Sequence, residues 1–372
     1  MRHAMMLARL ALLAVFCGLL GQAQAQDAPI LSQIDDPDER ARVAGLIEQA
    51  REEGALEWIG NFIEQAQGAA ALAEFKELYG LPDLTTEYTY EGAAQIPQKI
   101  VELLQAGRNN FDIVSTVGWD WYTDLLNAGE LMEYHSPSYK DYTLSDAAGI
   151  SKDGYWVADS YAFSPLYNPK ALADRGITDF HPTTWAELND PKLKGMITIG
   201  NPGSPSSGAT YAFLVKELGE DWLRDFARNV EPVINMRNSQ ARDWVASGEV
   251  PIAFMSHAKT ANALLEGNVD VKLIYPEEGV LLLPNTSAIL AKAPHPAAAK
   301  LFIDYLRSAK GTQTLMDTGA LMLFGRPGVK SPNPDILPGL ENIKVAKFDW
   351  DVDGTTEKLD NARRILAEQG LQ

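Results

Sequence analysis

The chain has 372 residues, with 50 acidic and 32 basic side chains and a net charge of −18. So acidic a chain is a poor partner for nucleic acid. Its only cysteine is Cys17, close to the N-terminus, so the rest of the chain offers no disulfide, no zinc-thiolate cluster and no cysteine nucleophile. Its length exceeds what one hydrophobic core usually accommodates, which predicts two lobes.

Residues 1–25 have the pattern of a cleavable export signal. Arg2 and Arg9 precede an apolar run from Leu10 to Leu20, and small residues follow at Ala23-Gln24-Ala25. The run is shorter than the ~20 apolar residues that a bilayer span needs. We therefore expect the mature chain to begin at Gln26 and to be periplasmic.

The alternative is a lipid anchor on Cys17, but the bulky Val15 and Phe16 before it fit a lipoprotein signal poorly. Removing the signal removes two of the 32 basic residues and no acid, which leaves 30 basic and 50 acidic residues and a charge of −20. That charge does not set the sign of a ligand, because a local group of donors can bind an anion inside an acidic protein.

Short β-like runs alternate with amphipathic helices in the first part of the chain, after a helix expected at Pro37–Glu53. This alternation favours a mainly parallel sheet with helices on both faces. The strand candidates are Leu56–Ile59, Thr86–Tyr90 and Ile113–Ser115, and the helix candidates are Ala69–Tyr79, Gln95–Gln105 and Trp121–Asn127.

A second α/β series follows, and the chain then returns through Val271–Tyr275 and Ser287–Leu290 to a helix at Ala297–Arg307. This order predicts one lobe inserted into the other, with two crossing strands. The second series comprises strands at Met196–Ile199, Pro232–Asn235 and Ile252–Phe254 and helices at Thr210–Leu218, Trp222–Asn229 and Ala241–Ala246.

Several sequence segments, taken in their order along the chain, resemble those of the extracellular solute-binding proteins of ABC importers. This family includes ferric-iron, phosphonate, sugar-phosphate and thiamine receptors. The segments are Phe111-Asp112-Ile113-Val114-Ser115-Thr116, Leu166-Tyr167-Asn168-Pro169-Lys170-Ala171-Leu172, Thr184-Trp185-Ala186-Glu187-Leu188, Asp190 to Ile197, Ser247-Gly248-Glu249-Val250-Pro251-Ile252-Ala253, and Ala293-Pro294-His295-Pro296 leading to Ala299 to Leu306.

The resemblance implies an α/β fold of the type II-like periplasmic binding protein form, with two lobes joined by two hinge strands. We expect lobe 1 to comprise residues 26–157 and 276–372, and lobe 2 residues 158–275. It also implies a monomer that closes over a small-molecule ligand, needs no cofactor and delivers the ligand to a membrane permease.

In open α/β sheets, ligands lie beyond the carboxyl ends of strands, where helix N-termini offer backbone N–H groups. The sharpest candidate is the loop from Asn201 to Thr210. Hydroxyls and amides there would converge on a phosphate, phosphonate, sulfonate or carboxylate, although one serine could simply cap the helix. The residues expected to bind are Ser204, Ser206, Ser207, Gly208 and Ala209, with Thr210 adding a hydroxyl.

Other candidates come from the remaining strand ends, and each has a structural alternative. Arg237 could clamp the same anion or be an ordinary surface arginine. Trp119 could form an aromatic wall, and Asp120 could accept from a ligand amine or hydroxyl. Tyr161 lies near the first crossing and could equally pack in a hinge. The set is completed by Asn61, Tyr90, Ser256 and His257.

Ferric iron is the alternative ligand. Iron-binding members of the family carry adjacent tyrosines after the strand that corresponds to Ile252–Phe254, whereas this chain has Ser256 and His257 there. Tyr88, Tyr90 and Tyr161 could build a different iron site. A secreted hydrolase is a weaker alternative, because the chain has no Gly-x-Ser-x-Gly, His-Glu-x-x-His or P-loop motif and only His257 could act as a base for Ser206 or Ser207. A sensory role without import stays open.

Overall fold

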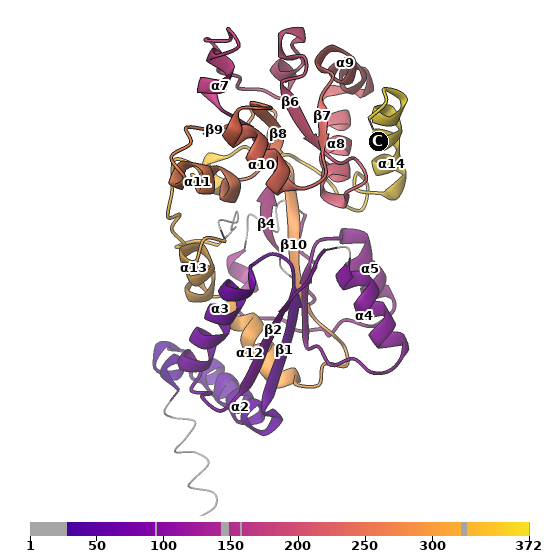
Figure 1. The fold of residues 1–372 in the computed structure, drawn as a ribbon. Helices are drawn as coiled ribbons and strands as arrows, with labels where there is room; N and C mark the ends of the chain where they lie inside the picture. The colour runs from indigo at the N-terminus through magenta and orange to yellow at the C-terminus, as the bar shows by residue number, and fades with distance from the viewer. Residues whose placement is uncertain (1–27, 94, 143–148, 157, 321–325, 372) are drawn as a thin grey trace, which may run out of the picture. The chain divides into compact units, whose positions relative to one another are not determined.

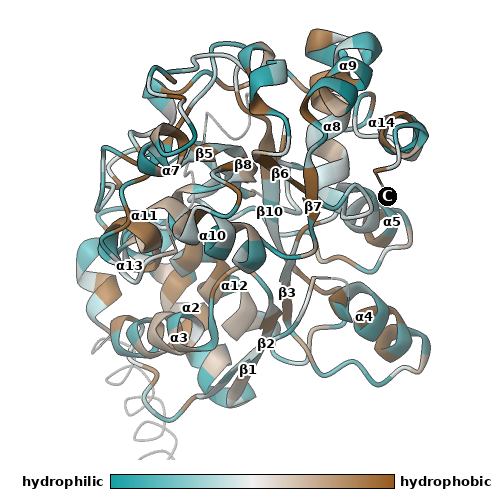
Figure 2. Ribbon diagram, turned by 45° about the horizontal axis from the view of Figure 1, so that its top comes forward, coloured by the Kyte–Doolittle hydropathy of each residue, from teal (hydrophilic) through white to brown (hydrophobic). Residues whose placement is uncertain are grey.

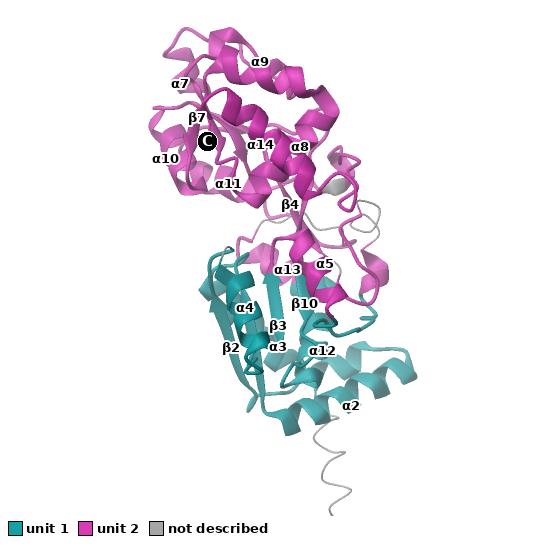
Figure 3. Cartoon of the chain, turned by 90° about the vertical axis from the view of Figure 1, so that its right-hand side faces the viewer, with its two compact units in different colours: residues 1–115, 129–138, 287–311 teal, residues 116–128, 139–286, 312–372 magenta. Residues whose placement is uncertain are grey.

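The computed structural model describes residues 28–93, 95–142, 149–156, 158–320 and 326–371. The expected export signal and Cys17 lie outside these ranges. The chain forms two compact units: unit 1 comprises residues 1–115, 129–138 and 287–311, and unit 2 comprises residues 116–128, 139–286 and 312–372 (Figure 3). No helix within the described ranges is both long and apolar enough to span a bilayer.

The first sheet has the strand order β2-β1-β3-β10-β4. Strand β1 pairs in parallel with both β2 and β3, whereas β10 and β4 are antiparallel. The sheet is therefore mixed rather than mainly parallel. Its strands are β1 (Ala55–Gly60), β2 (Thr85–Tyr90), β3 (Ile113–Thr116), β4 (Asp159–Ala162) and β10 (Leu282–Ile289).

Unit 1 builds its core from aromatic side chains of the sheet and its helices. The ring of Phe302 lies 5.0 Å from Trp58 and 5.1 Å from Phe75, both at steep angles, the edge-on geometry that aromatic pairs favour. The helices of this unit are α2 (Pro37–Glu53), α3 (Gln65–Leu78), α4 (Gln95–Gln105) and α12 (Pro296–Arg307), and α13 (Ala309–Asp317) begins in it (Figure 1).

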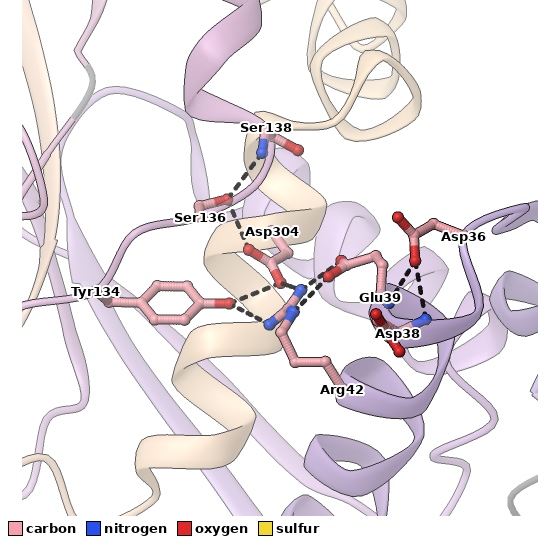
Figure 4. Close-up of polar contacts among 8 residues, drawn as sticks. All are labelled: Asp36, Asp38, Glu39, Arg42, Tyr134, Ser136, Ser138 and Asp304. Atoms are coloured by element: carbon pink, nitrogen blue, oxygen red, sulfur yellow. Dashed lines mark hydrogen bonds and ion pairs between the residues drawn. The ribbon is translucent and has the colours of Figure 1, made fainter.

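A nearly buried carboxylate joins α2 to α12 in unit 1 (Figure 4). Asp304 accepts hydrogen bonds from Arg42 at 2.7 Å, from the Tyr134 hydroxyl at 2.8 Å and from the Ser136 hydroxyl at 2.6 Å. Arg42 also donates to both carboxylate oxygens of Glu39, one turn earlier on α2. The long N-terminal helix is thus held by a hydrogen-bonded ion pair as well as by apolar packing.

The second sheet lies entirely in unit 2 and has the order β7-β6-β8-β5-β9. Strand β6 is parallel to β7 and β8, and β5 is antiparallel to β8 and β9. Figure 2 shows β6 and β7 coloured toward the hydrophobic end of the scale. The strands are β5 (Ser164–Tyr167), β6 (Ile197–Gly200), β7 (Val233–Asn235), β8 (Ile252–Ser256) and β9 (Lys272–Leu273).

The helices of unit 2 each bury one apolar face in the core of the unit. In α9, for example, Leu223, Phe226 and Val230 are buried at helical spacing while its acidic first turn faces outward. The helices are α5 (Trp119–Asn127), α7 (Pro169–Ala173), α8 (Pro205–Leu218), α9 (Glu220–Val230), α10 (Asn238–Ser247), α11 (Ala258–Glu266) and α14 (Thr356–Glu368).

Every strand and helix predicted from the sequence is present, but three features differ. The helix expected to begin at Thr210 begins at Pro205, because proline suits the first turn of a helix and Ser204 caps it. The sheets are mixed because β10 and β4 pair antiparallel, as β5 does with β8 and β9. The units also divide the chain elsewhere than the lobes expected from the sequence: the described residues of 116–128, 139–156, 276–286 and 312–371 group with unit 2, where α14 packs on α8 and α9.

Candidate functional site

The turn from β6 into α8 places the serine-rich segment at a helix N-terminus. Ser204 is the N-cap, and its hydroxyl oxygen accepts from the Ser207 amide at 3.4 Å. One turn into the helix, the Tyr211 hydroxyl donates to the Gly200 carbonyl at 2.6 Å and ties α8 to the end of β6. The segment is therefore held rigidly between the strand and the helix.

Tyr161 and Ser206 form the polar pair of this site. Their hydroxyl oxygens lie 2.7 Å apart, so that strand β4 and the first turn of α8 meet through one hydrogen bond. Burial raises the pKa of Tyr161 to about 12, against the opposing effect of the Ser206 hydrogen bond. Tyr161 therefore stays a neutral phenol, and the pair offers two hydroxyl groups beside the positive end of the α8 dipole.

His257 is linked to Tyr161 through the ring of Phe163. The Phe163 ring is 5.7 Å from Tyr161 and 6.4 Å from the imidazole of His257. Burial, together with the charge of Lys259, lowers the pKa of His257 from 6.5 to about 4. Its Nδ1 accepts from the Thr260 amide at 3.3 Å, which caps α11 and leaves the proton of the neutral ring on Nε2.

The amides expected from Gly208 and Ala209 are not presented as an anion nest, because these two residues lie inside α8 rather than in a loop. The Gly208 amide donates to the Ser204 carbonyl at 2.8 Å within the helix. Ser207 is buried against Gly200, where a side chain would collide with its hydroxyl. The Thr210 hydroxyl donates to the Ser206 carbonyl at 2.9 Å. Of the serine cluster, Ser206 is the member whose hydroxyl meets Tyr161.

Ser256 and Arg237 are placed differently. Ser256 is buried at the end of β8, opposite Ser164 of β5 and directly before His257. Arg237 is exposed at the start of α10. It lines a surface cavity along α10 with residues such as Gln240 and Trp244, and Ser206 is not part of that cavity.

In unit 1, Asn61 follows the end of β1. Its amide donates to the Ser115 carbonyl at 3.2 Å, while its side-chain oxygen Oδ1 is buried and accepts no hydrogen bond from the described residues. Tyr90, at the end of β2, is 47% exposed, and burial with the nearby Glu64 raises its pKa. Asn61 thus supplies an acceptor that the described part of the chain leaves unused.

Trp119 and Asp120 begin α5 and have partners on the C-terminal segment. The Trp119 indole N–H donates to Asp351 at 2.8 Å, and only 8% of the residue is exposed. Asp120 accepts from Thr356 at 3.4 Å, and burial raises its pKa. The structure does not bring either residue to the Tyr161 and Ser206 pair by any contact within unit 2.

The tyrosines considered for iron are all in environments that disfavour phenolate. Tyr88 is buried and donates to the Ile63 carbonyl at 2.9 Å, and burial raises its pKa, as it does for Tyr90 and Tyr161. Across the described ranges, no three or more His, Cys, Asp or Glu side chains are grouped as metal ligands.

Two partners of the site were not predicted from the sequence. Phe163 connects Tyr161 to His257, and Arg363 of α14 lies against Gly208, where a Cβ would be 3.1 Å from its guanidinium. Arg363 also donates to the Pro202 carbonyl at 3.0 Å and so braces the turn before α8. The absence of a side chain at Gly208 is the only sequence signal for this packing.

The sequence profile of the bacterial extracellular solute-binding proteins matches residues 110–351. The chain belongs to this family. An uncharacterized protein of Haemophilus influenzae is 27% identical over 304 residues, which cover 78% of this chain and 83% of the relative. The predicted family and the predicted fold class, a two-lobed α/β periplasmic binding protein, are confirmed.

Solved structures with the same fold bind different ligands. The periplasmic binding protein AfuA from Actinobacillus pleuropneumoniae, with fructose-6-phosphate bound, is 21% identical with a TM-score of 0.69 and covers 86% of this chain and 99% of its own. Iron-bound HitA from Pseudomonas aeruginosa is 20% identical with a TM-score of 0.66 and covers 85% and 99%. At these identities the likeness shows the fold alone.

Proposed function

We propose that this solute-binding protein is the periplasmic receptor of an ABC importer and that it binds a small anionic organic ligand at Tyr161 and Ser206. The observation that carries the proposal is the hydrogen bond of 2.7 Å between these hydroxyls at the first turn of α8. The receptor is exported by residues 1–25, acts without catalysis and needs no cofactor.

The chemistry of this pair suits an anion. With Tyr161 donating to Ser206, the serine hydroxyl proton can turn toward a ligand oxygen, and the helix N-terminus adds a favourable potential. No backbone N–H of α8 beyond the first turn is needed. A neutral His257 could add a further N–H from Nε2, which makes the site a set of donors without a fixed positive charge.

The remaining contacts belong to the proposal as well. Asn61 Oδ1 is suited to accept from a ligand hydroxyl, and Tyr90 offers an exposed ring at the next strand end. We further propose that the two units close over the ligand, so that both contribute to binding. Arg237 stays a prediction, because its exposed position gives no contact with Ser206.

The test begins with a thermal-shift screen of ligand-free mature protein against sugar phosphates, phosphonates, sulfonates, carboxylates and ferric citrate. A ligand at a hundredfold excess over its dissociation constant stabilises the native state by ~2.7 kcal/mol. A shift with one anionic organic class is expected. A shift with ferric ion alone would reject the proposed ligand class and favour the tyrosine-based alternative.

Calorimetry with variants then tests the site. Ser206→Ala and Tyr161→Phe each remove one hydroxyl from the pair, and each should weaken binding by roughly tenfold, the equivalent of ~1.4 kcal/mol for a hydrogen bond to a charged group. Ser247→Ala, an exposed serine at the end of α10, is the matched control and should bind as the wild type does. Unchanged affinity in both site variants would rule out this pair.

Catalysis and sensing are tested separately. If incubation of candidate esters with the protein leaves them unchanged, the hydrolase alternative fails. Genes for a permease and an ATPase beside this one would support import, and a membrane sensor gene in their place would support a sensory role.

A further inference from the structure

A second cavity in unit 2 lies away from Tyr161 and Ser206. It has a volume of about 680 Å³ and is formed by the first residue of α5, residues 149–152, Lys216 of α8 and residues 345–351. Its size falls in the range of small-molecule sites. Lys216 is ten residues beyond Ser206 on α8, which separates the two places by ~15 Å of helix.

The apolar part of this cavity is aromatic. Trp119 and Trp350 stack with their ring centroids 6.2 Å apart and their planes at 29°, and Phe348 meets Trp350 edge-on at 5.1 Å. All three side chains are at most 8% exposed. Rigid rings fixed by one another provide a preformed surface for a flat ligand.

Four donors around these rings have no acceptor in the described part of the chain. The Trp350 indole Nε1 and the Ser151 hydroxyl are buried without a partner. The ammonium groups of Lys152 and Lys347, which also line the cavity, make no hydrogen bond or ion pair with described residues. Because the Trp350 and Ser151 atoms are closed to solvent, the two ammonium groups are the donors that a ligand in the cavity can reach.

The acidic groups nearby are already engaged. Asp351 accepts from Trp119 at 2.8 Å, and Asp349 accepts from the amides of Asp351 and Val352 at 3.0 and 3.2 Å. Asp353 accepts from Lys216 at 2.6 Å; although burial opposes it, the hydrogen bonds of Lys216 and Lys358 lower the pKa of Asp353 to about 2. These contacts hold the three carboxylates in place, and none of them is with Lys152 or Lys347.

We propose that this cavity is a second binding site, for a small aromatic compound that carries a carboxylate or a similar anion. The flat ring lies on Trp119, Phe348 and Trp350, and the anion accepts from the ammonium groups of Lys152 and Lys347. The site is independent of the proposed transport ligand, because none of its lining residues belongs to the Tyr161 and Ser206 pair.

Three probes separate the parts of this recognition. By calorimetry on the full mature protein, 2-naphthoate, which has ring and anion, should bind with a measurable dissociation constant. Its neutral analogue 2-naphthylmethanol and the ring-free anion acetate should each bind at least tenfold more weakly, since each lacks one half of the interaction. Equal binding of the neutral analogue would reject the anion, and no binding of 2-naphthoate at millimolar concentration would reject the site.

Matched variants locate the binding. Lys152→Met with Lys347→Met should weaken 2-naphthoate at least tenfold, whereas Lys170→Met with Lys272→Met makes the same charge change at exposed lysines of unit 2 and should not. Trp350→Phe should weaken binding several-fold, while Trp222→Phe removes an equally unpartnered indole N–H outside the cavity and should have no effect.

Ser206→Ala distinguishes this site from the first one. It should leave the affinity for 2-naphthoate unchanged, even where it weakens the transport ligand. If 2-naphthoate instead lost affinity in Ser206→Ala and kept it in the double lysine variant, the compound would occupy the first site and the second site would be rejected.

Discussion

His257 has a structural role that can be separated from its proposed role in binding. Its ring accepts from the first turn of α11, and its pKa of about 4 keeps it neutral at physiological pH. Its position at the end of β8 was predictable from sheet geometry, because that strand was recognised by its apolar run. Its protonation state was not, since burial depends on Phe163 and on strands distant in sequence.

A pH-dependent contribution to stability follows from this depressed pKa. Between pH 6.5 and about 4 the unfolded chain binds a proton at His257 that the folded chain does not, so the contribution is present above pH 6.5 and is lost as the pH falls. His257→Asn keeps a good helix cap and removes the titration. From pH 7.5 to 5.5 the wild type should lose about 1 kcal/mol more unfolding free energy than this variant.

Urea unfolding at the two pH values measures the difference. The control is His181→Asn, whose side chain is 78% exposed and which should show the wild-type pH dependence. If the wild type and His257→Asn lose the same unfolding free energy between the two pH values, the fold does not hold His257 in its neutral form.

At the scale of elements, α8 shows where sequence reasoning succeeded and where it stopped. The strand, the serine-rich turn and the helix were all expected in the right order. The helix start was misplaced by five residues, because Pro205 was counted with the loop although proline is suited to a first helical turn. Because the helix begins at Pro205, Gly208 and Ala209 lie within it and their amides are not open to a ligand. Ser206, in the first turn, contacts Tyr161.

The contact of α14 with α8 was beyond sequence reasoning for a different reason. Nothing local in residues 356–368 indicates which surface they cover, and the decisive contact is that of Arg363 with Gly208 and Pro202, about 160 residues away. The same holds for Asp351, whose partner Trp119 is 232 positions distant. Local patterns predict elements, whereas long-range pairs decide which polar groups are free to bind.

The docking of α2 on α12 through Asp304 gives a prediction at this scale. Asp304→Asn removes the charge that pairs with Arg42. It also places an amide NH₂ donor opposite the hydroxyl of Tyr134 or Ser136, each of which donates to Asp304 in the wild type. Burial raises the pKa of Asp304, so the carboxylate depends on these donors to stay ionised. The variant should lose about 2 kcal/mol of unfolding free energy, because a neutral amide cannot accept from all three donors and Arg42 keeps only Glu39 as a charged partner.

Chemical denaturation monitored by circular dichroism tests this loss. Asp174→Asn is the matched control, because it breaks an exposed pair with Lys170 and should cost less than about 0.5 kcal/mol. An Asp304→Asn midpoint equal to that of the control would mean that apolar packing alone holds α2.

At the scale of the whole molecule, the division into two units matters for function. The chain passes between the units five times, and two of these crossings, after Ser115 and after Thr286, lie within strands β3 and β10. Repeated chain connections favour a hinge over free tumbling. A ligand moves such an equilibrium only by the difference in its affinity for the two states, which requires that both units touch it when closed.

Closure can be followed by energy transfer between labels on the two units. The only cysteine of the chain is Cys17, ahead of the expected mature start, so Gln105→Cys in unit 1 and Glu217→Cys in unit 2 give one exposed labelling site each. Adding the anion identified by the screen should raise the transfer efficiency, with a midpoint roughly tenfold higher in the Ser206→Ala background. A pair within unit 2, Glu217→Cys with Lys272→Cys, should not respond. If calorimetry shows saturation while the first pair stays constant, the ligand binds without closure, and the proposed closing motion of the two units is rejected.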